Sequence, residues 1–173
     1  LGSVSVICSD KTGTLTKNEM TVAEIVTAEN CFALTGTGYA PGGAVLMGGE
    51  EIDPKRHTHL VTLARSAILC SEAVLAGEAD DRHVIGDAME GALLVMAGKI
   101  GLDPTGERRA CPQTDAIPFD ARHRFMATLH HDHESHAAVY VKGAPERLIG
   151  MCVDQQRADD SRVPLDPAHW EAE

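Results

Sequence analysis

The sequence is poor in aromatic residues and in positive charge. Aromatic residues make up 3% of its 173 residues against 43% for hydrophobic residues as a whole, so a core has to be built from Val, Leu, Ile, Ala and Met. Lys and Arg number 15 against 26 Asp and Glu, and the formal net charge is −11. Nucleic acids and anionic membrane surfaces are bound by clustered Lys and Arg. The composition therefore argues against either as a partner.

Paired cysteines and long apolar runs are missing as well. The cysteines are far apart, odd in number and without a C-x-x-C pair, which is typical of buried thiols in a reducing compartment and not of disulfides or a zinc site. No apolar run reaches the roughly 18 residues that span a bilayer, and no signal-peptide pattern opens the chain. We therefore expect a soluble chain with one domain, or one domain plus a fragment of another.

The most informative stretch is residues 4–22. The β-branched residues Val4, Val6 and Ile7 predict a buried strand that stops before Asp10 and a threonine-rich loop. Ligands bind at this end of strands in open α/β sheets, where a carboxylate meets a phosphate and its metal. An ionised aspartate attacks a phosphoryl group without a general base when Mg²⁺ neutralises the facing charges. Taken alone, these residues also fit an Asx-type turn.

Residues 10–16, Asp-Lys-Thr-Gly-Thr-Leu-Thr, resemble the phosphorylation motif of the P-type ATPases, ion pumps that pass through an aspartyl-phosphate intermediate. Residues 17–22 are similar to its continuation in calcium and sodium pumps. The resemblance implies that Asp10 is the phosphorylated nucleophile, assisted by Lys11 and Thr12. It also implies that the Asp10 carboxylate and the Thr12 carbonyl hold Mg²⁺. A further Mg²⁺ ligand is expected outside the sequence, which has no Thr-Gly-Asp or Gly-Asp-Gly-x-Asn-Asp motif.

Residues 20–28 and 31–34 favour β-strands, and the Gly- and Pro-rich residues 36–43 predict a loop. The alternative for this loop is a phosphate cradle of the glycine-rich type. A cradle needs a preceding strand and a following helix, and the Gly-containing apolar run that follows does not predict a helix. We therefore favour the loop.

Apolar periodicity predicts two helices. The first begins at Pro54 and includes apolar residues as far as Val74, at steps of mostly three and four. The second has Asp87 as its N-cap and continues to about Ile100, before a glycine that ends it. The polar residues 105–113 predict a connection rich in turns.

Glu90 lies near the start of the second predicted helix. Taken alone, it is a carboxylate that complements the helix dipole. Residues 86–93, Gly-Asp-Ala-Met-Glu-Gly-Ala-Leu, resemble a motif of the nucleotide-binding domain of the same pumps, Gly-Asp-Pro-Thr-Glu-Gly-Ala-Leu, whose Glu accepts a hydrogen bond from the adenine amino group. Ala88 and Met89 stand where that motif has Pro and Thr. The resemblance implies a nucleotide-binding role for Glu90.

Residues 116–129 and 137–142 predict a β-hairpin. The segment from Phe119 to Met126 resembles the family's Phe-Ser-x-x-x-Lys/Arg-x-Met, in which the ring stacks on adenine and the basic residue, here Arg124, reaches towards the phosphates. Stacking of a base on an aromatic ring contributes ~1–3 kcal/mol in single-stranded nucleic-acid sites, so we expect Phe119 to be important for affinity. Without the resemblance, Phe119 would be a core aromatic and Arg124 a solvated residue.

Residues 142–146, Lys-Gly-Ala-Pro-Glu, match a further motif of the family in full. A strand delivers Lys142, Gly143 lets backbone approach the ligand closely, and Pro145 starts a short helix. The resemblance implies that Lys142 lies in the floor of the adenine pocket and that Gly143 is nearby. The residues alone equally allow a lysine at the end of a strand, before a turn.

The predicted turn of the hairpin, residues 130–136, is dense in His, Asp and Glu. Such a cluster can bind a transition metal. Its place on a turn favours a solvated tip with weak chelation at most.

The motifs occur in family order over nearly the whole chain. The resemblance implies an α/β (α+β) fold with an antiparallel twisted sheet flanked by helices, preceded by one strand of the phosphorylation domain. Residues 1–19 would belong to the phosphorylation domain and the hinge. Residues 20–173 would form a nucleotide-binding domain that is incomplete at its C-terminus.

The function so implied is that of the ATP-binding cytosolic portion of a pump that couples ATP hydrolysis, through an aspartyl-phosphate on Asp10, to cation transport. The cofactors would be ATP and Mg²⁺, and the partners the transported cation and the other domains of the pump, in the plasma membrane. The chain alone is expected to bind nucleotide without turnover.

Two alternatives stay open. A soluble phosphatase of the haloacid dehalogenase type shares an Asp at a strand end, but such enzymes read Asp-x-Asp, and Thr12 stands at the second position. A non-catalytic nucleotide-binding module would keep Glu90, Phe119 and Lys142 without needing Asp10.

Overall fold

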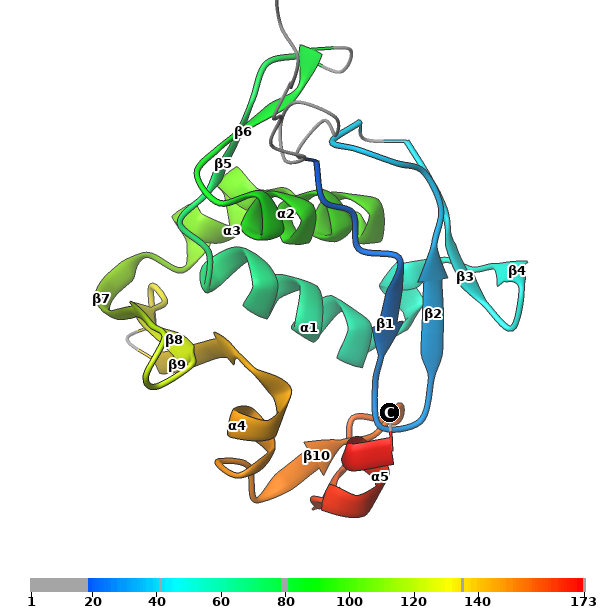
Figure 1. The fold of residues 1–173 in the computed structure, drawn as a ribbon, viewed down its shortest axis with the longest axis vertical. Helices are drawn as coiled ribbons and strands as arrows, with labels where there is room; N and C mark the ends of the chain where they lie inside the picture. Colours follow the sequence, from blue (N-terminus) through cyan, green and yellow to red (C-terminus); the bar gives the residue numbers. More distant parts are fainter. Residues whose placement is uncertain (1–18, 41, 79–80, 135, 173) are drawn as a thin grey trace, which may run out of the picture.

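Two packed helices form the centre of the molecule, in a computed structural model that describes residues 19–40, 42–78, 81–134 and 136–172. Helices α1 (Thr58–Leu69) and α2 (Ala88–Ile100) lie against each other, with short antiparallel strands around them (Figure 1). The predicted strand and phosphorylation loop, with Asp10, Lys11 and Thr12, fall outside the described residues.

The described strands form antiparallel sheets of neighbours in sequence. The first sheet has the order β1 (Glu24–Val26), β2 (Cys31–Leu34), β3 (Val45–Met47), β4 (Glu50–Glu51). A hairpin joins β5 (Val74–Ala76) to β6 (His83–Ile85), and another joins β10 (Asp154–Gln156) to β11 (Arg162–Pro164). The longest strands form a sheet in the order β7 (Gln113–Asp120), β8 (Phe125–His131), β9 (Ala137–Gly143). The shorter helical elements are η1 (Pro54–Arg56), α3 (Pro104–Ala110), α4 (Pro145–Ile149) and α5 (Pro167–Ala172).

Helix α2 confirms its prediction at both ends. The Asp87 carboxylate accepts hydrogen bonds from the backbone N–H groups of Met89 and Glu90, at 2.9 and 3.1 Å. Gly101 ends the helix with a φ of 93°, a left-handed conformation that glycine adopts without steric cost.

The predicted first helix was too long. Helix α1 ends at Leu69, and Val74 begins strand β5, paired with Ile85. Beyond the helix, the backbone N–H groups of Glu72 and Ala73 donate to the Glu90 carboxylate of α2. These bonds replace the hydrogen bonds that another helical turn would make. The apolar periodicity of the sequence contains no information on partners so far along the chain, so it predicted a helix that was too long.

The turn-rich connection predicted over residues 105–113 was wrong in its first part, which is helix α3. Asp103 caps this helix by accepting from the N–H groups of Thr105 and Gly106, and Pro104 occupies its first turn. Asp-Pro at a helix start is a recognisable signal. The helix was nevertheless not predicted, because α3 has no buried residue and therefore shows no apolar stripe in the sequence. Charged side chains hold it in place.

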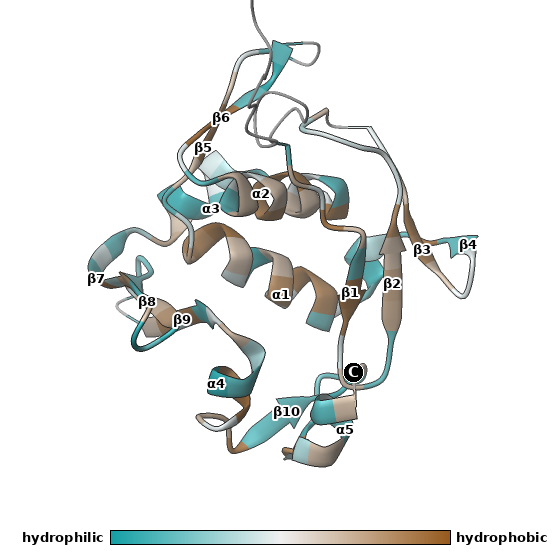
Figure 2. Cartoon of the chain, viewed as in Figure 1, coloured by the Kyte–Doolittle hydropathy of each residue, from teal (hydrophilic) through white to brown (hydrophobic). Residues whose placement is uncertain are grey.

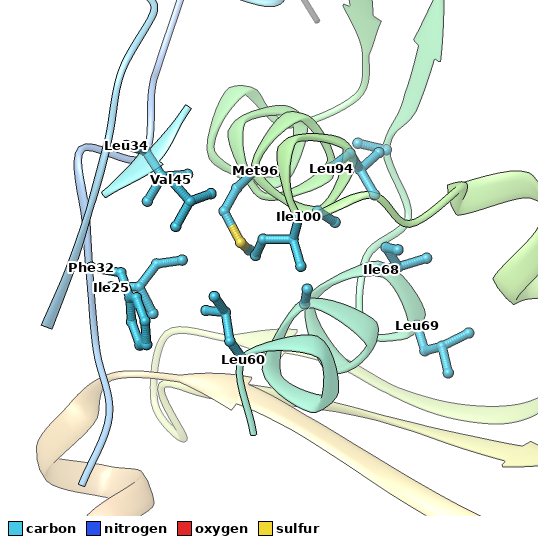
Figure 3. Packing of buried hydrophobic residues seen from close by; sticks show 13 residues of the cluster. Ile25, Phe32, Leu34, Val45, Leu60, Ile68, Leu69, Leu94, Met96 and Ile100 are labelled. Atoms are coloured by element: carbon cyan, nitrogen blue, oxygen red, sulfur yellow. The ribbon is translucent and has the colours of Figure 1, made fainter. Parts of the chain in front are cut away.

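The core is aliphatic, as the composition predicted, and lies between α1, α2 and the first sheet. Figure 3 shows side chains from these elements converging, among them Leu60 and Ile68 of α1 and Ile100 of α2, all with no exposed surface. Phe32 of β2 joins them, also fully buried. Each such side chain contributes ~1.5–3 kcal/mol by leaving water. The core thereby fixes α2, whose first turn carries Glu90.

The predicted hairpin of residues 116–129 and 137–142 is confirmed for β8 and β9. Its first segment is wrong as a single strand, because a turn at residues 121–124 divides it into the antiparallel strands β7 and β8. The register of β7 shifts between Ile117 and Asp120, around Phe119. Figure 2 shows hydrophobic, brown stretches on α1 and on strands β8 and β9. The fold is therefore mixed α and β with antiparallel sheets, and no helix within its described ranges has the length and apolarity to cross a membrane.

Candidate functional site

A cavity of about 590 Å³ lies between the β5–β6 hairpin, the start of α2 and the sheet of β7–β9. Its lining includes Glu90, Phe119, Met126 and Lys142, all of which the sequence singled out. These residues come from α2, β7, β8 and β9. The fold therefore brings together side chains from separate motifs in one hollow.

Glu90 and Lys142 form the polar floor of the cavity. The Lys142 ammonium donates to Glu90 Oε1 at 2.5 Å, and Glu90 Oε2 accepts from the backbone N–H groups of Glu72 and Ala73, each at 2.8 Å. The side chains of Lys142 and Glu90 are only 17% and 10% exposed. The same ammonium lies 3.4 Å from the Ser71 hydroxyl.

The environment keeps the Glu90 carboxylate ionised. Burial on its own would raise the pKa of Glu90, but the hydrogen bonds from Lys142, Ala73 and Glu72 outweigh that effect and hold the pKa below its ordinary value. A buried carboxylate that is both paired and hydrogen-bonded avoids most of the cost of leaving water. The interpretation that Glu90 only complements the helix dipole does not account for these three hydrogen bonds.

Phe119 and Met126 provide apolar surface of two different kinds. Phe119 is 63% exposed on β7, whereas Met126 is 3% exposed on β8. The alternative that Phe119 is a core aromatic is therefore wrong. An exposed phenyl ring beside a hollow is a surface on which a flat ligand can stack.

Arg124 and Gly143 lie outside the lining of this cavity. The Arg124 guanidinium pairs with Glu146 Oε1 at 2.5 Å, and both side chains are more than half exposed, 54% and 60%. A Cβ on Gly143 would lie 2.4 Å from the Arg124 carbonyl oxygen and 2.6 Å from Phe125 Cα. The close approach expected at Gly143 is thus an approach to the backbone of Arg124 and Phe125, at the start of β8.

Sequence reasoning missed part of the apolar lining of the cavity. The missed residues are the apolar side chains Val74, Ile85 and Met89, each between 44% and 60% exposed and each lining the cavity. Val74 had been placed in a helix, and the strands of the β5–β6 hairpin are too short for alternation to reveal them. The signal at Met89 was its departure from the family motif.

The histidine-rich segment 130–136 divides into two parts. His130 is buried, with ring nitrogens 2.8 Å from the carbonyl of Cys111 and 3.0 Å from that of Leu69. At the turn, the Asp132 carboxylate accepts from the N–H of Glu134 and from the N–H and ring Nδ1 of His136. The described ranges hold no group of three or more His, Cys, Asp or Glu side chains arranged for a metal ion.

Comparisons with known proteins show the family to which the sequence is similar. A family model described as P-type ATPase, cytoplasmic domain N matches residues 59–172. Probable cation-transporting ATPase F of Mycobacterium tuberculosis is 41% identical over 169 residues, which cover 97% of the chain and 19% of that protein. Cation-transporting ATPase pma1 of Synechocystis sp. is 38% identical over 171 residues, 96% of the chain and 19% of that protein.

A human relative is more distant. Calcium-transporting ATPase type 2C member 1 of Homo sapiens is 34% identical over 160 residues, which cover 90% of the chain and 17% of that protein. The chain thus spans about a fifth of the length of the curated relatives it matches.

Proposed function

Since the chain belongs to the family of P-type ATPase cytoplasmic N domains, we propose that it binds ATP for a pump that transports a cation across a membrane. The observation that carries the proposal is the cavity lined by Glu90, Phe119, Met126 and Lys142. Three separate motifs supply these residues, and a chance likeness of any one motif would not make them meet.

In the proposed complex, the adenine ring stacks on the exposed face of Phe119. The apolar side chains of Val74, Ile85 and Met89, which line the same cavity, then cover other parts of the base. Such stacking contributes ~1–3 kcal/mol per base. An apolar hollow with a few convergent polar groups is the usual form of a small-molecule site.

The polar floor matches the edge of the base. A carboxylate oxygen has two lone pairs, so Glu90 Oε1 accepts from the adenine amino group while it keeps its bond to Lys142. An ammonium has three N–H donors, and within the described parts of the chain Lys142 contacts Glu90 and, weakly, Ser71. The remaining donor serves a ring nitrogen of the base.

Arg124 is proposed to bind the phosphates outside the cavity. Its guanidinium is exposed and is paired only with an exposed carboxylate among the described residues, and such pairs are weak, with a median near ~0–1 kcal/mol. A triphosphate carries more charge than Glu146 and offers bidentate acceptors. Gly143 contributes indirectly by keeping β9, and with it Lys142, close to β8.

The chemistry is proposed for the loop of residues 10–16. The Asp10 carboxylate attacks the γ-phosphorus, the bond to the β–γ bridging oxygen breaks, and ADP leaves with that electron pair. Asp10 and Thr12 supply the carboxylate and carbonyl oxygens that Mg²⁺ prefers, and the ion would neutralise charge between the two anions. Lys11 adds a positive charge near the transferred group.

Other parts of a pump complete the proposal. The cation would be bound by membrane helices, and the site of action would be the cytosolic side of the plasma membrane. Residues 1–19 would belong to the phosphorylation domain and residues 20–173 to the nucleotide-binding domain. Because no second aspartate motif for Mg²⁺ occurs in the sequence, we expect the chain alone to bind ATP without turnover.

Calorimetric titration of the chain with ATP tests the proposal, with Phe119→Ala as the variant. We expect binding by the parent chain and a loss of about 1–3 kcal/mol in the variant, the range for base stacking. ATP binding that is indifferent to Phe119 would show that the base lies elsewhere. A steady release of phosphate that is abolished by Asp10→Asn would contradict the absence of turnover and favour a self-sufficient phosphatase.

A further inference from the structure

We propose that Arg108 is a positioning residue for the nucleotide site, acting through the backbone of residues 71–73. This inference rests on the proposed function and adds a residue to it. Arg108 lies on α3, outside the lining of the cavity.

Arg108 holds one edge of this backbone segment. Its Nη2 donates to the carbonyl oxygens of Ser71 at 2.7 Å and Ala73 at 3.0 Å, with a longer contact of 3.4 Å to Ile68 at the end of α1. One nitrogen thus bridges the two nearest carbonyls, those of Ser71 and Ala73. Hydrogen bonds from a charged donor are stronger than those between neutral groups.

Glu90 holds the other edge of the same segment, since its carboxylate accepts from the N–H groups of Glu72 and Ala73. The chain between α1 and β5 is therefore fixed between an anion on its donors and a cation on its acceptors. Burial lowers the pKa of Arg108 and the nearby Glu90 charge opposes that shift, consistent with two charges that face one another across the backbone.

The segment so held is part of the nucleotide site. Glu72, Ala73 and Val74 line the cavity, and the Ser71 hydroxyl lies 3.4 Å from Lys142 Nζ. Arg108 lines a separate hollow of about 430 Å³, on which Val74 also borders. Arg108 thus supports the cavity wall from behind and without contact to the nucleotide.

A purely structural role would make Arg108 an anchor of α3 on α1. The neighbouring residue already provides such an anchor, because Glu107 Oε2 accepts from Arg65 Nε of α1 at 2.7 Å. Arg65→Met removes this anchor and leaves the bonds to residues 71 and 73 intact. It is therefore the matched control for Arg108→Met.

The test is calorimetric titration of the full chain and its variants with ATP, with adenosine and with inorganic triphosphate. For Arg108→Met we expect ATP and adenosine each to bind about tenfold more weakly, equivalent to about 1.4 kcal/mol. Any binding of triphosphate stays unchanged, because Arg108 acts on the base wall. Arg108→Lys restores part of the affinity relative to Arg108→Met, since lysine keeps the charge on a shorter side chain and lacks the Nη2 atom that reaches both carbonyls. Arg65→Met changes the ATP affinity less than twofold.

Several outcomes overturn the inference while leaving the proposed function in place. One is that the parent chain binds ATP and the Arg108→Met chain binds it with equal affinity. Another is an equal loss in Arg65→Met and Arg108→Met. Where circular dichroism shows that Arg108→Met is unfolded, Arg108→Lys decides, and a parent-like affinity in that folded variant overturns the inference that the Nη2 contacts to Ser71 and Ala73 position the site. A parent chain that binds no ATP fails the proposed function itself.

Discussion

The Lys142 ammonium meets the Glu90 carboxylate at 2.5 Å, although the first lies on strand β9 and the second on helix α2. Two further bonds to the same carboxylate fix the start of β5. One buried ion pair therefore connects the helix, the long sheet and the hairpin that together enclose the cavity.

Removal of one partner of this pair is predicted to be costly. In Lys142→Met the carboxylate stays buried without its cation, and we expect the free energy of unfolding to fall by about 3 kcal/mol, as for broken buried pairs. The double variant Glu90→Gln/Lys142→Met keeps an acceptor for the Glu72 and Ala73 amides and buries no unpaired charge. Urea denaturation should show it to be more stable than Lys142→Met, and a double variant that is less stable would refute this account.

Stability is predicted to fall in acid through Glu90. Its pKa in the folded chain lies below the ordinary 4.5, so its contribution is fully present above about pH 4.5 and is lost as the pH falls through the lower, folded value. Urea denaturation between pH 3 and 6 should therefore give a steeper acid loss for the parent chain than for Glu90→Gln. Other carboxylates are common to both chains and cancel. Equal slopes would mean that Glu90 titrates alike in the folded and unfolded states.

Gly91 is predicted to be irreplaceable because of the hairpin next to it. A Cβ at this position would lie 2.2 Å from Val84 Cγ2 of β6. Gly91→Ala should lower the free energy of unfolding by about 1–3 kcal/mol, the cost of overpacking, and weaken ATP binding by displacing Ile85. Gly98→Ala is the control on the same helix, since its Cβ would have nothing within 4 Å, and it should stabilise by up to about 1 kcal/mol. Equal effects of the two changes would exclude the steric explanation.

Arg124 is predicted to matter for phosphates and little for folding. Its pair with Glu146 is exposed on both sides, so Arg124→Ala should leave the thermal midpoint nearly unchanged. In calorimetry, we expect the same variant to lose affinity for ATP while its affinity for adenosine stays the same. Glu146→Ala releases the guanidinium from its partner and should bind ATP at least as well as the parent chain. Equal losses for ATP and adenosine would place Arg124 at the base instead.

The elements that could be predicted from sequence are those whose signals are local. Asp87 and Gly101 fix both ends of α2 by short-range hydrogen bonding and backbone conformation, and the β-branched and aromatic residues of β8 and β9 favour strands. The motif residues Glu90, Phe119, Met126 and Lys142 were chosen by resemblance, and the fold brings them to one cavity.

The parts that could not be predicted depend on distant partners. The end of α1 is decided by Glu90 and Arg108, which lie far along the chain from the carbonyls and amides they bind. Strands β5 and β6 are too short to show a period of two. Arg108 belongs to no recognised motif, and the sequence around it predicted a polar turn. Only the structure shows that it lies on α3, behind the cavity wall.

The ion pair on the floor of the cavity also bears on how quickly nucleotide arrives. Glu90 and Lys142 cancel each other's charge, so the floor exerts little long-range pull, while the chain as a whole carries −11. A polyanion such as ATP is therefore repelled by the chain as it approaches. The positive charge of Arg124 outside the cavity reduces this repulsion only near itself. At an ionic strength of 0.1 M the Debye length is about 10 Å, and salt largely screens the repulsion beyond that distance. Association should accordingly speed up as ionic strength rises, the reverse of electrostatic steering.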